Sequence, residues 1–415
     1  MPFTTDPEIE LMSPAGSYES LMAAIQGGAG SVYFGVGSLN MRARSSQNFS
    51  LDDLKNIASI CREHEIRSYV TLNTVIYDDE FGLMEQIADA AREAGISALI
   101  ASDQAVIQYA GQIGMPVHMS TQANISNVEA VKFYARYADV MVTARELNLD
   151  QVLAITRAIR EQGIRGPSGN LVRIEVFAHG ALCMAISGKC YLSLDHFNAS
   201  ANRGACYQLC RRPYRVFDHD GEVELEVDNE YIMSPKDLKT IDFLDRILAA
   251  GVTVLKIEGR GRGPEYVKTV TRCYREAIDS IREGTYTPEK IAHWTEQLLT
   301  VYNRGFWDGY YLGRTLGEWS SRYGSQATRT KVYVGQVTNY FTRLKVAEIR
   351  MEAGSLTVGD EIHIIGPTTG VVEETVREIR YELHPIQQVK KGAVCSIPVD
   401  SYLRRSDKVY RVDKK

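Results

Sequence analysis

The chain has 415 residues, of which 44% are hydrophobic and 24% charged, and its formal net charge is −5. This composition is ordinary for a globular protein with one large and one smaller domain, and the acidic balance excludes a globally basic nucleic-acid binder. No run approaches about 18 apolar residues, and the N-terminus lacks a basic stretch followed by an apolar one. The sequence therefore predicts no membrane span and no secretory signal, and we expect a cytoplasmic protein.

Short apolar runs alternate with amphipathic helical patterns along the first three quarters of the chain. Eight runs are predicted to be strands, at Ile9–Met12, Ser31–Phe34, Tyr69–Asn73, Ala98–Ala101, Val117–Ser120, Asp139–Val142, Arg173–Phe177 and Val252–Ile257. Helices are predicted between and after them, at Tyr18–Ile25, Leu51–Glu63, Gly82–Ala94, Asp103–Gln112, Val128–Tyr137, Leu149–Gln162, Pro235–Ala250 and Glu265–Arg282. Ser50 and Ser234 are expected to be N-caps.

Eight βα repeats predict an α/β fold, a TIM-like (β/α)8 barrel that occupies residues 1–312. The rival is an open doubly wound sheet, but no G-x-G-x-x-G motif follows the first strand. One connection is much longer than the others, because almost sixty residues separate the seventh strand from the next helix. An insertion at this point emerges on the face where barrel enzymes keep their active sites.

Four of the seven cysteines fall in this insertion, at residues 183–210, with the spacing C-x6-C-x15-C-x3-C. Disulfides are disfavoured because an intracellular chain keeps its thiols reduced. Zinc and an iron–sulfur cluster both remain open, although structural zinc prefers paired short knuckles. The candidate ligands are Cys183, Cys190, Cys206 and Cys210, whereas the isolated Cys61, Cys273 and Cys395 are expected to be buried.

Polar residues follow most predicted strands, and arginines are frequent among them. Arg42, Arg44, Arg145 and Arg260 are expected to meet on one rim of the barrel and to bind an anion through their guanidinium forks. His179 and Glu258 end the seventh and eighth strands and are the candidate acid–base residues, with a structural role as the alternative for His179. The hydrolase motifs H-E-x-x-H and G-x-S-x-G are absent from the sequence.

Basic residues also gather beside the cysteines. Arg203, Arg211 and Arg212 belong to a basic strip at residues 203–215 that could hold nucleic-acid phosphates, although a solvated loop is the plainer interpretation.

The last hundred residues change character. Residues 313–329 are rich in Gly, Ser and Arg and are predicted to be a linker. Residues 330–415 are predicted to form a small closed β-barrel, from six runs at Lys331–Thr338, Leu344–Arg350, Glu361–Ile365, Val371–Arg380, Ala393–Val399 and Lys408–Val412. Such a module suits contact with nucleic acid or a partner, or simple packing.

The segments EVFAHGALCMAISGKCYLS, ELMSPAG and KIEGRGRGPEYV resemble the collagenase-like peptidases of family U32, from about Glu8 to Tyr274. The resemblance implies that the four clustered cysteines hold a 4Fe–4S cluster. It also implies prephenate, a small dicarboxylate, as co-substrate and tRNA as the macromolecular partner. The barrel followed by one small module is most similar to members that form 5-hydroxyuridine at the wobble position. The alternatives are a peptidase, as in the family's old label, hydroxylation of ribosomal RNA, or a non-catalytic accessory protein. No protein partner is predicted.

Overall fold

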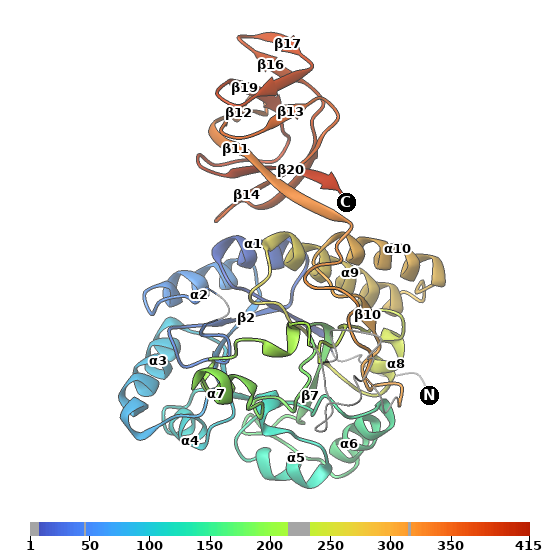
Figure 1. The fold of residues 1–415 in the computed structure, drawn as a ribbon. Coiled ribbons are helices and arrows are strands. Elements are labelled where there is room, and N and C mark those ends of the chain that lie inside the picture. The colour runs from blue at the N-terminus through green and yellow to red at the C-terminus, as the bar shows by residue number, and fades with distance from the viewer. Residues whose placement is uncertain (1–7, 45–46, 215–232, 314–316) are drawn as a thin grey trace, which may run out of the picture.

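The computed structural model describes residues 8–44, 47–214, 233–313 and 317–415. Its first part is a closed barrel of eight parallel strands, in which β9 pairs with both β7 and β1. Figure 1 looks along this barrel, with helices surrounding the strands. The predicted (β/α)8 architecture is therefore confirmed. Its strands are β1 (Glu10–Pro14), β2 (Ser31–Gly35), β3 (Arg67–Leu72), β4 (Ala98–Ala101), β5 (Val117–Met119), β6 (Val140–Val142), β7 (Arg173–Gly180) and β9 (Val254–Ile257).

The helices begin and end largely where the sequence places them. Ser17 caps the first helix through a bond from the Ser20 backbone, and Gly95, in the left-handed region, ends the third. Ser50 is not an N-cap, because its backbone and hydroxyl bind the Asp53 carboxylate and the helix begins at Asp53. The helices around the barrel are α1 (Tyr18–Gln26), α2 (Asp53–Glu63), α3 (Phe81–Ala94), α4 (Gln104–Gln112), α5 (Val128–Tyr134), α6 (Leu149–Glu161), α8 (Leu244–Ala249), α9 (Pro264–Arg282) and α10 (Pro288–Thr300).

Alternation along the strands divides the core into two layers. Side chains such as Leu11 and Leu255 face the helices and join the large outer cluster. Their neighbours in sequence, Met12 and Val254, belong to a separate inner cluster with Tyr33. The barrel interior is therefore filled below the mouth, as is usual for eight strands.

The segment at residues 234–250 differs from its prediction. A helix from Pro235 was expected, but Asp237–Lys239 forms the short strand β8, antiparallel to the end of β7 and paired with β10 (Phe306–Trp307). Ser234 is not an N-cap, since its hydroxyl accepts a bond from Arg211. Asp237 also forms a buried ion pair of 3.2 Å with Arg304. Helical patterning within residues 234–250 does not reveal these distant partners.

The predicted linker is held against the barrel where the structure describes it. Trp319 bridges to Pro235, and the backbone nitrogen of Ser320 donates to the Ser234 carbonyl over 2.7 Å. Ser320 is fully buried. Residues 317–328 are therefore part of the packed structure.

The C-terminal module, residues 329–415, is an antiparallel sheet around its own apolar core. All six predicted runs coincide with strands, and the strands that were missed are mostly three residues long. The eight-stranded sheet runs β15-β14-β20-β11-β12-β19-β16-β17, and β13 pairs with β18 beside it. The strands are β11 (Arg329–Phe341), β12 (Val346–Met351), β13 (Ser355–Thr357), β14 (Glu361–Gly366), β15 (Gly370–Thr375), β16 (Ile379–Tyr381), β17 (His384–Ile386), β18 (Gln388–Lys390), β19 (Val394–Pro398) and β20 (Lys408–Lys414).

The module stands on α1 and α9 at one side of the barrel (Figure 1). The Gln26 side chain donates to the Thr369 carbonyl and accepts from the Val371 backbone, at 2.8 and 2.9 Å. Gly370 has a φ of +67°, and a Cβ there would lie 2.5 Å from the Gln26 amide oxygen, so another residue would be strained and would displace the Gln26 side chain. Val371 belongs to the barrel's own apolar cluster, which makes this interface a fixed one.

Candidate active site

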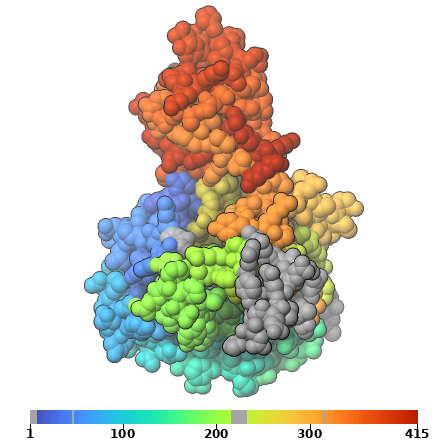
Figure 2. Space-filling model, in the orientation of Figure 1, coloured from blue at the N-terminus to red at the C-terminus, as the bar shows by residue number. Residues whose placement is uncertain are grey.

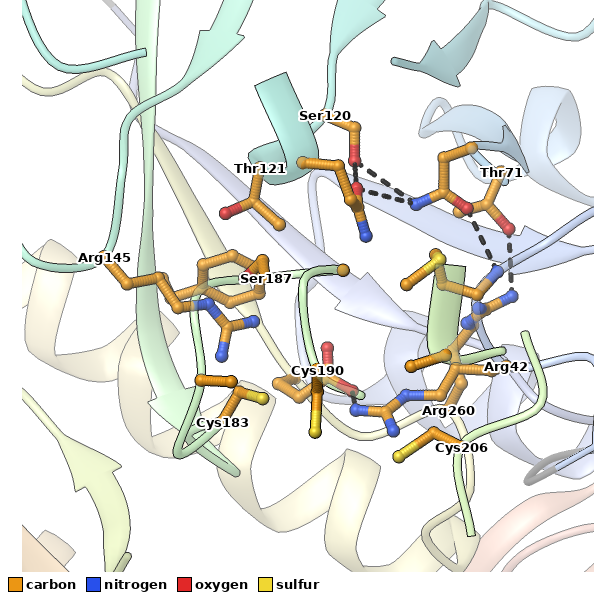
Figure 3. Close-up of a pocket in the computed structure, with 18 of the residues that line it drawn as sticks. Arg42, Thr71, Ser120, Thr121, Arg145, Cys183, Ser187, Cys190, Cys206 and Arg260 are labelled. Atoms are coloured by element: carbon orange, nitrogen blue, oxygen red, sulfur yellow. Dashed lines mark hydrogen bonds and ion pairs between the residues drawn. The ribbon is translucent and has the colours of Figure 1, made fainter. Parts of the chain in front are cut away.

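A cavity of about 150 Å³ opens at the carboxyl end of the barrel (Figure 3), and residues of the insertion that carries helix α7 (Leu192–Phe197) help to line it. Its volume is about that of an engineered cavity that holds benzene. Barrel strands supply one wall and the cysteine insertion the other. The lining residues used below are Tyr33, Arg42, Thr71, Arg145, Phe177, Cys183, Met184, Cys190, Cys206, Cys210, Lys256, Glu258 and Arg260.

All four clustered cysteines line this one cavity, and all are free thiols. Burial raises the pKa of Cys210 to about 11, Arg211 lowers it, and the three other thiols raise it again. The other three sulfurs therefore lie within electrostatic reach of Cys210, and Figure 3 shows Cys183, Cys190 and Cys206 around the same cavity.

The spacing of these thiols bears on what they can hold. Within the described residues, no three His, Cys, Asp or Glu side chains are arranged to hold a single metal ion. Zinc requires sulfurs about 2.3 Å from one centre. A four-iron cluster receives each thiolate at a different iron, so its ligands stand further apart. Four thiols on one cavity are a donor set that either group can take, and zinc and a four-iron cluster both remain open on this observation.

Two arginines of the basic strip at residues 203–215 bind groups outside the strip and hold the insertion against the barrel. Arg203 forms a two-pronged ion pair with Glu80 and stacks on Tyr77, 3.8 Å from the ring centroid. Arg211 donates to the carbonyls of Leu182 and Pro235, each over 2.6 Å. Sequence alone could not show this, because Glu80 lies 123 residues from Arg203. Arg212 is exposed, and Arg215 lies outside the described residues.

Arg42 and Glu258 form one ion pair at the edge of the cavity, with 2.8 Å between Nη2 and Oε1. Burial by itself would raise the pKa of Glu258, but Arg42, Arg145 and Arg260 lower it to about 2. Glu258 in turn raises the pKa of Arg42. A carboxylate held ionised this firmly is a counter-ion for the arginines and a weak general base.

The remaining rim arginines occupy different surroundings. Arg260 is buried and donates to Asn40 and Thr71 over 3.1 and 2.9 Å, and burial lowers its pKa to about 10. Arg44 is exposed and bonds the Tyr207 hydroxyl, outside the residues that line the cavity. The structure therefore brings Arg42, Arg145 and Arg260 together and leaves Arg44 at the surface.

Arg145 offers the best-placed cationic group. Its guanidinium lies 3.8 Å from the centroid of the Phe177 ring, and Nη1 donates to the Ala181 carbonyl over 3.2 Å. Its Nε is buried and has no hydrogen-bond partner among the described residues. A buried donor without a partner is costly, so an anionic ligand in the cavity would satisfy it.

Lys256 was missed by sequence reasoning. It is buried at the cavity floor, pairs with Glu175 over 2.9 Å and lies 4.5 Å from the Tyr33 ring centroid. Lys256 lies on β9 two residues before Glu258, which directly follows the strand, and side chains two apart share a face of an extended segment. This two-residue spacing from Glu258 is the feature of the sequence that could have identified Lys256 as a cavity residue.

His179 does not line the cavity. It is buried among Tyr266, Tyr274 and Phe306, and burial lowers its pKa to about 3. A neutral histidine enclosed by aromatic rings fits the structural alternative.

The fold and the site together describe a (β/α)8 barrel protein with a four-cysteine insertion at the carboxyl end of its barrel. The chain belongs to Peptidase family U32, whose model matches residues 16–321. A collagenase from Porphyromonas gingivalis is 61% identical over 98% of this chain and 99% of its own length. A tRNA hydroxylation protein from Bacillus subtilis is 30% identical over 92% of this chain and 91% of its own.

A 23S ribosomal-RNA 5-hydroxycytidine synthase from Escherichia coli is 36% identical over 66% of this chain, which covers 40% of that protein. These relatives carry names from two classes, RNA hydroxylation and proteolysis. Where the structure describes the chain, no helix has the length and apolar character needed to span a membrane.

Proposed function

We propose that this protein is an iron–sulfur RNA hydroxylase that forms 5-hydroxyuridine at the wobble position of tRNA, with prephenate as co-substrate. The observation that carries the proposal is the convergence of four free thiols on one cavity at the carboxyl end of the barrel. Cys183, Cys190, Cys206 and Cys210 would hold the cluster, which when bound would supply redox chemistry beside the cavity. A tRNA substrate implies a cytoplasmic protein.

The choice of tRNA rests on the extent of the likeness. The Bacillus subtilis tRNA hydroxylation protein matches across both the barrel and the module, whereas the ribosomal-RNA synthase is a longer protein of which less than half is covered. The module carries exposed cations on two loops, Arg343 on one and Arg404 and Arg405 on the other, with Arg404 lying over the Tyr402 ring. Such side chains suit contacts with a phosphate backbone.

The co-substrate would bind in the cavity with its carboxylates toward Arg145. Phe177, which lies against that arginine, and Met184 line the cavity and suit a six-membered ring, while Lys256 adds positive charge. Arg42 and Arg260 would act mainly by keeping Glu258 ionised and the wall in place.

The test is expression of the chain in a bacterium that lacks its own tRNA hydroxylation protein, followed by mass spectrometry of tRNA nucleosides. We expect 5-hydroxyuridine to return, and to be lost when Cys206→Ala replaces the wild type. Anaerobic purification should give about four iron and four sulfide per chain. Stoichiometric zinc without sulfide, or tRNA that stays unmodified, would overturn the proposal.

A peptidase is the second candidate, favoured by the name of the Porphyromonas gingivalis relative. The cavity offers no support for it, since no histidine is among its described lining residues and Glu258 is a weak base. Digestion of gelatin by the purified protein, abolished by a cavity substitution such as Arg145→Ala, would favour the peptidase.

A further inference from the structure

The insertion exposes three aromatic side chains beside the cysteines. Tyr191 follows Cys190 and is 74% exposed, and Tyr207 follows Cys206 and is 44% exposed. Phe197, at the end of α7, is 47% exposed and lies 4.9 Å from Tyr207 between ring centroids. Figure 2 shows the insertion as part of the open front surface of the barrel. Cys190 and Leu192, on either side of Tyr191, and Cys206, before Tyr207, line the cavity. Exposed aromatic rings next to cavity-lining residues mark an interaction site.

The local structure fixes where these rings lie. The Tyr207 backbone nitrogen donates to the buried Ser193 hydroxyl over 3.0 Å, which joins the two cysteine stretches across α7. Arg203 and Arg211 anchor the insertion to the barrel on either side, as described above. The aromatic rings are therefore presented from a fixed base, one residue away from two of the four thiols.

Positive charge accompanies the rings. Arg44 bonds the Tyr207 hydroxyl and its guanidinium lies 5.8 Å from that ring's centroid. Lys189 and Arg212 are exposed on the same insertion. Aromatic faces interleaved with cations are the combination that binds single-stranded nucleic acid, because bases stack on the rings and phosphates pair with the cations.

We propose that Tyr191, Phe197 and Tyr207 form a stacking platform for unpaired bases of an RNA loop, with Arg44 and Lys189 holding its phosphates. This inference rests on the proposed function, because it identifies the surface with which an RNA hydroxylase would hold its substrate. A base must leave its stack before its ring can be modified, and the bases beside it then need new stacking partners. The platform stands where those neighbouring bases would lie when the target base enters the cavity.

The experiment uses the full-length protein and a fluorescent anticodon stem-loop RNA. Tyr191→Ala and Tyr207→Ala should each weaken stem-loop binding about 5- to 100-fold and leave binding of a double-stranded stem nearly unchanged. Tyr191→Phe should restore binding, because it keeps the ring. Phe133→Ala is the matched control, since Phe133 is 48% exposed on α5 and also lies under an arginine, Arg136.

Melting temperature and iron content, measured for every variant, show that the fold is intact. Equal binding of the stem-loop by wild type, Tyr191→Ala and Tyr207→Ala would overturn the platform, and so would an equal loss in Phe133→Ala. A gelatin peptide that binds through these rings while RNA does not would overturn it in favour of a protein partner. Ring-dependent RNA binding without any 5-hydroxyuridine would support the platform and refute the proposed reaction.

Discussion

The two ends of the barrel differ in how far their polar groups are occupied by partners within the chain. At the amino end, Glu10 on β1 is fully buried and accepts bonds from Tyr69, Arg67 and Arg173 at 2.7, 3.0 and 2.9 Å. Burial alone would raise the pKa of Glu10, but the two arginines and the tyrosine lower it. Glu10, Arg67 and Arg173 are thus paired with one another, and this network stabilises the fold.

At the carboxyl end the groups are only partly satisfied. The four thiols are free, and Nε of Arg145 is buried without a partner among the described residues. A ligand bound at this end would pair groups that the chain leaves free. Substitutions at the two ends should therefore separate stability from ligand binding.

The largest effect is expected from the cysteines. Cys183→Ala or Cys206→Ala removes one thiolate from the proposed set of four, so the brown absorbance and the bound iron should be lost from anaerobically purified protein. Cys273→Ala is the control, because Cys273 is buried on α9 away from the cavity. Iron retained in all the cavity variants would show that the thiols do not act as ligands.

Glu10→Gln should lower the free energy of unfolding by about 2–3 kcal/mol, because Arg67 and Arg173 lose their shared counter-charge. Urea denaturation measures this, and iron content should not change. Glu129→Gln on α5 breaks a pair of similar length, 2.7 Å, at the surface and should cost at most about 0.5 kcal/mol. If the two variants lose equal stability, the amino-end network is not the stabilising feature described here.

Arg145→Ala should weaken prephenate binding about 10- to 100-fold, since a charged hydrogen-bond partner contributes roughly 1.5–3 kcal/mol. Calorimetric titration of the holoprotein measures the affinity. Arg165→Ala is the control at the opposite end of the barrel, where Arg165 donates to the Gly169 carbonyl at the surface. Unchanged affinity in Arg145→Ala would move the anion site elsewhere in the cavity.

The fold could be predicted because its signals are local. Each barrel strand is a short apolar run, and each helix has periodic apolar residues with recognisable ends. The strand β8 was missed because the Asp237–Arg304 pair and the Trp319 bridge come from residues more than sixty positions away. No pattern within residues 234–250 contains that information.

The sequence predicted which residues lie at the candidate site, but not what each of them does there. The sequence placed the cysteines and Arg145 at the correct end of the barrel, since strand ends and insertions define that face. It could not distinguish arginines that remain available to a ligand from those that hold the structure. Arg203 is paired with Glu80, and Arg260 donates to Asn40 and Thr71, and these partners come together only when the chain folds.

The smallest effect is expected on the stability of the fold at acid pH. A buried neutral histidine at each end of the barrel contributes to it. Burial lowers the pKa of both His118 and His179 to about 3. In the unfolded chain each histidine takes up a proton near pH 6.5, whereas the folded state resists protonation until about pH 3. Stability is therefore unaffected above pH 6.5 and falls as the pH drops between these values. At about pH 5.5 each histidine lowers the free energy of unfolding by up to about 1.4 kcal/mol.

His179→Gln should reduce the difference in unfolding free energy between about pH 7.5 and pH 5.5 by that amount, whatever its effect at neutral pH. An unchanged difference would mean that His179 takes up a proton in the folded protein, and would return it to the candidate acid–base residues.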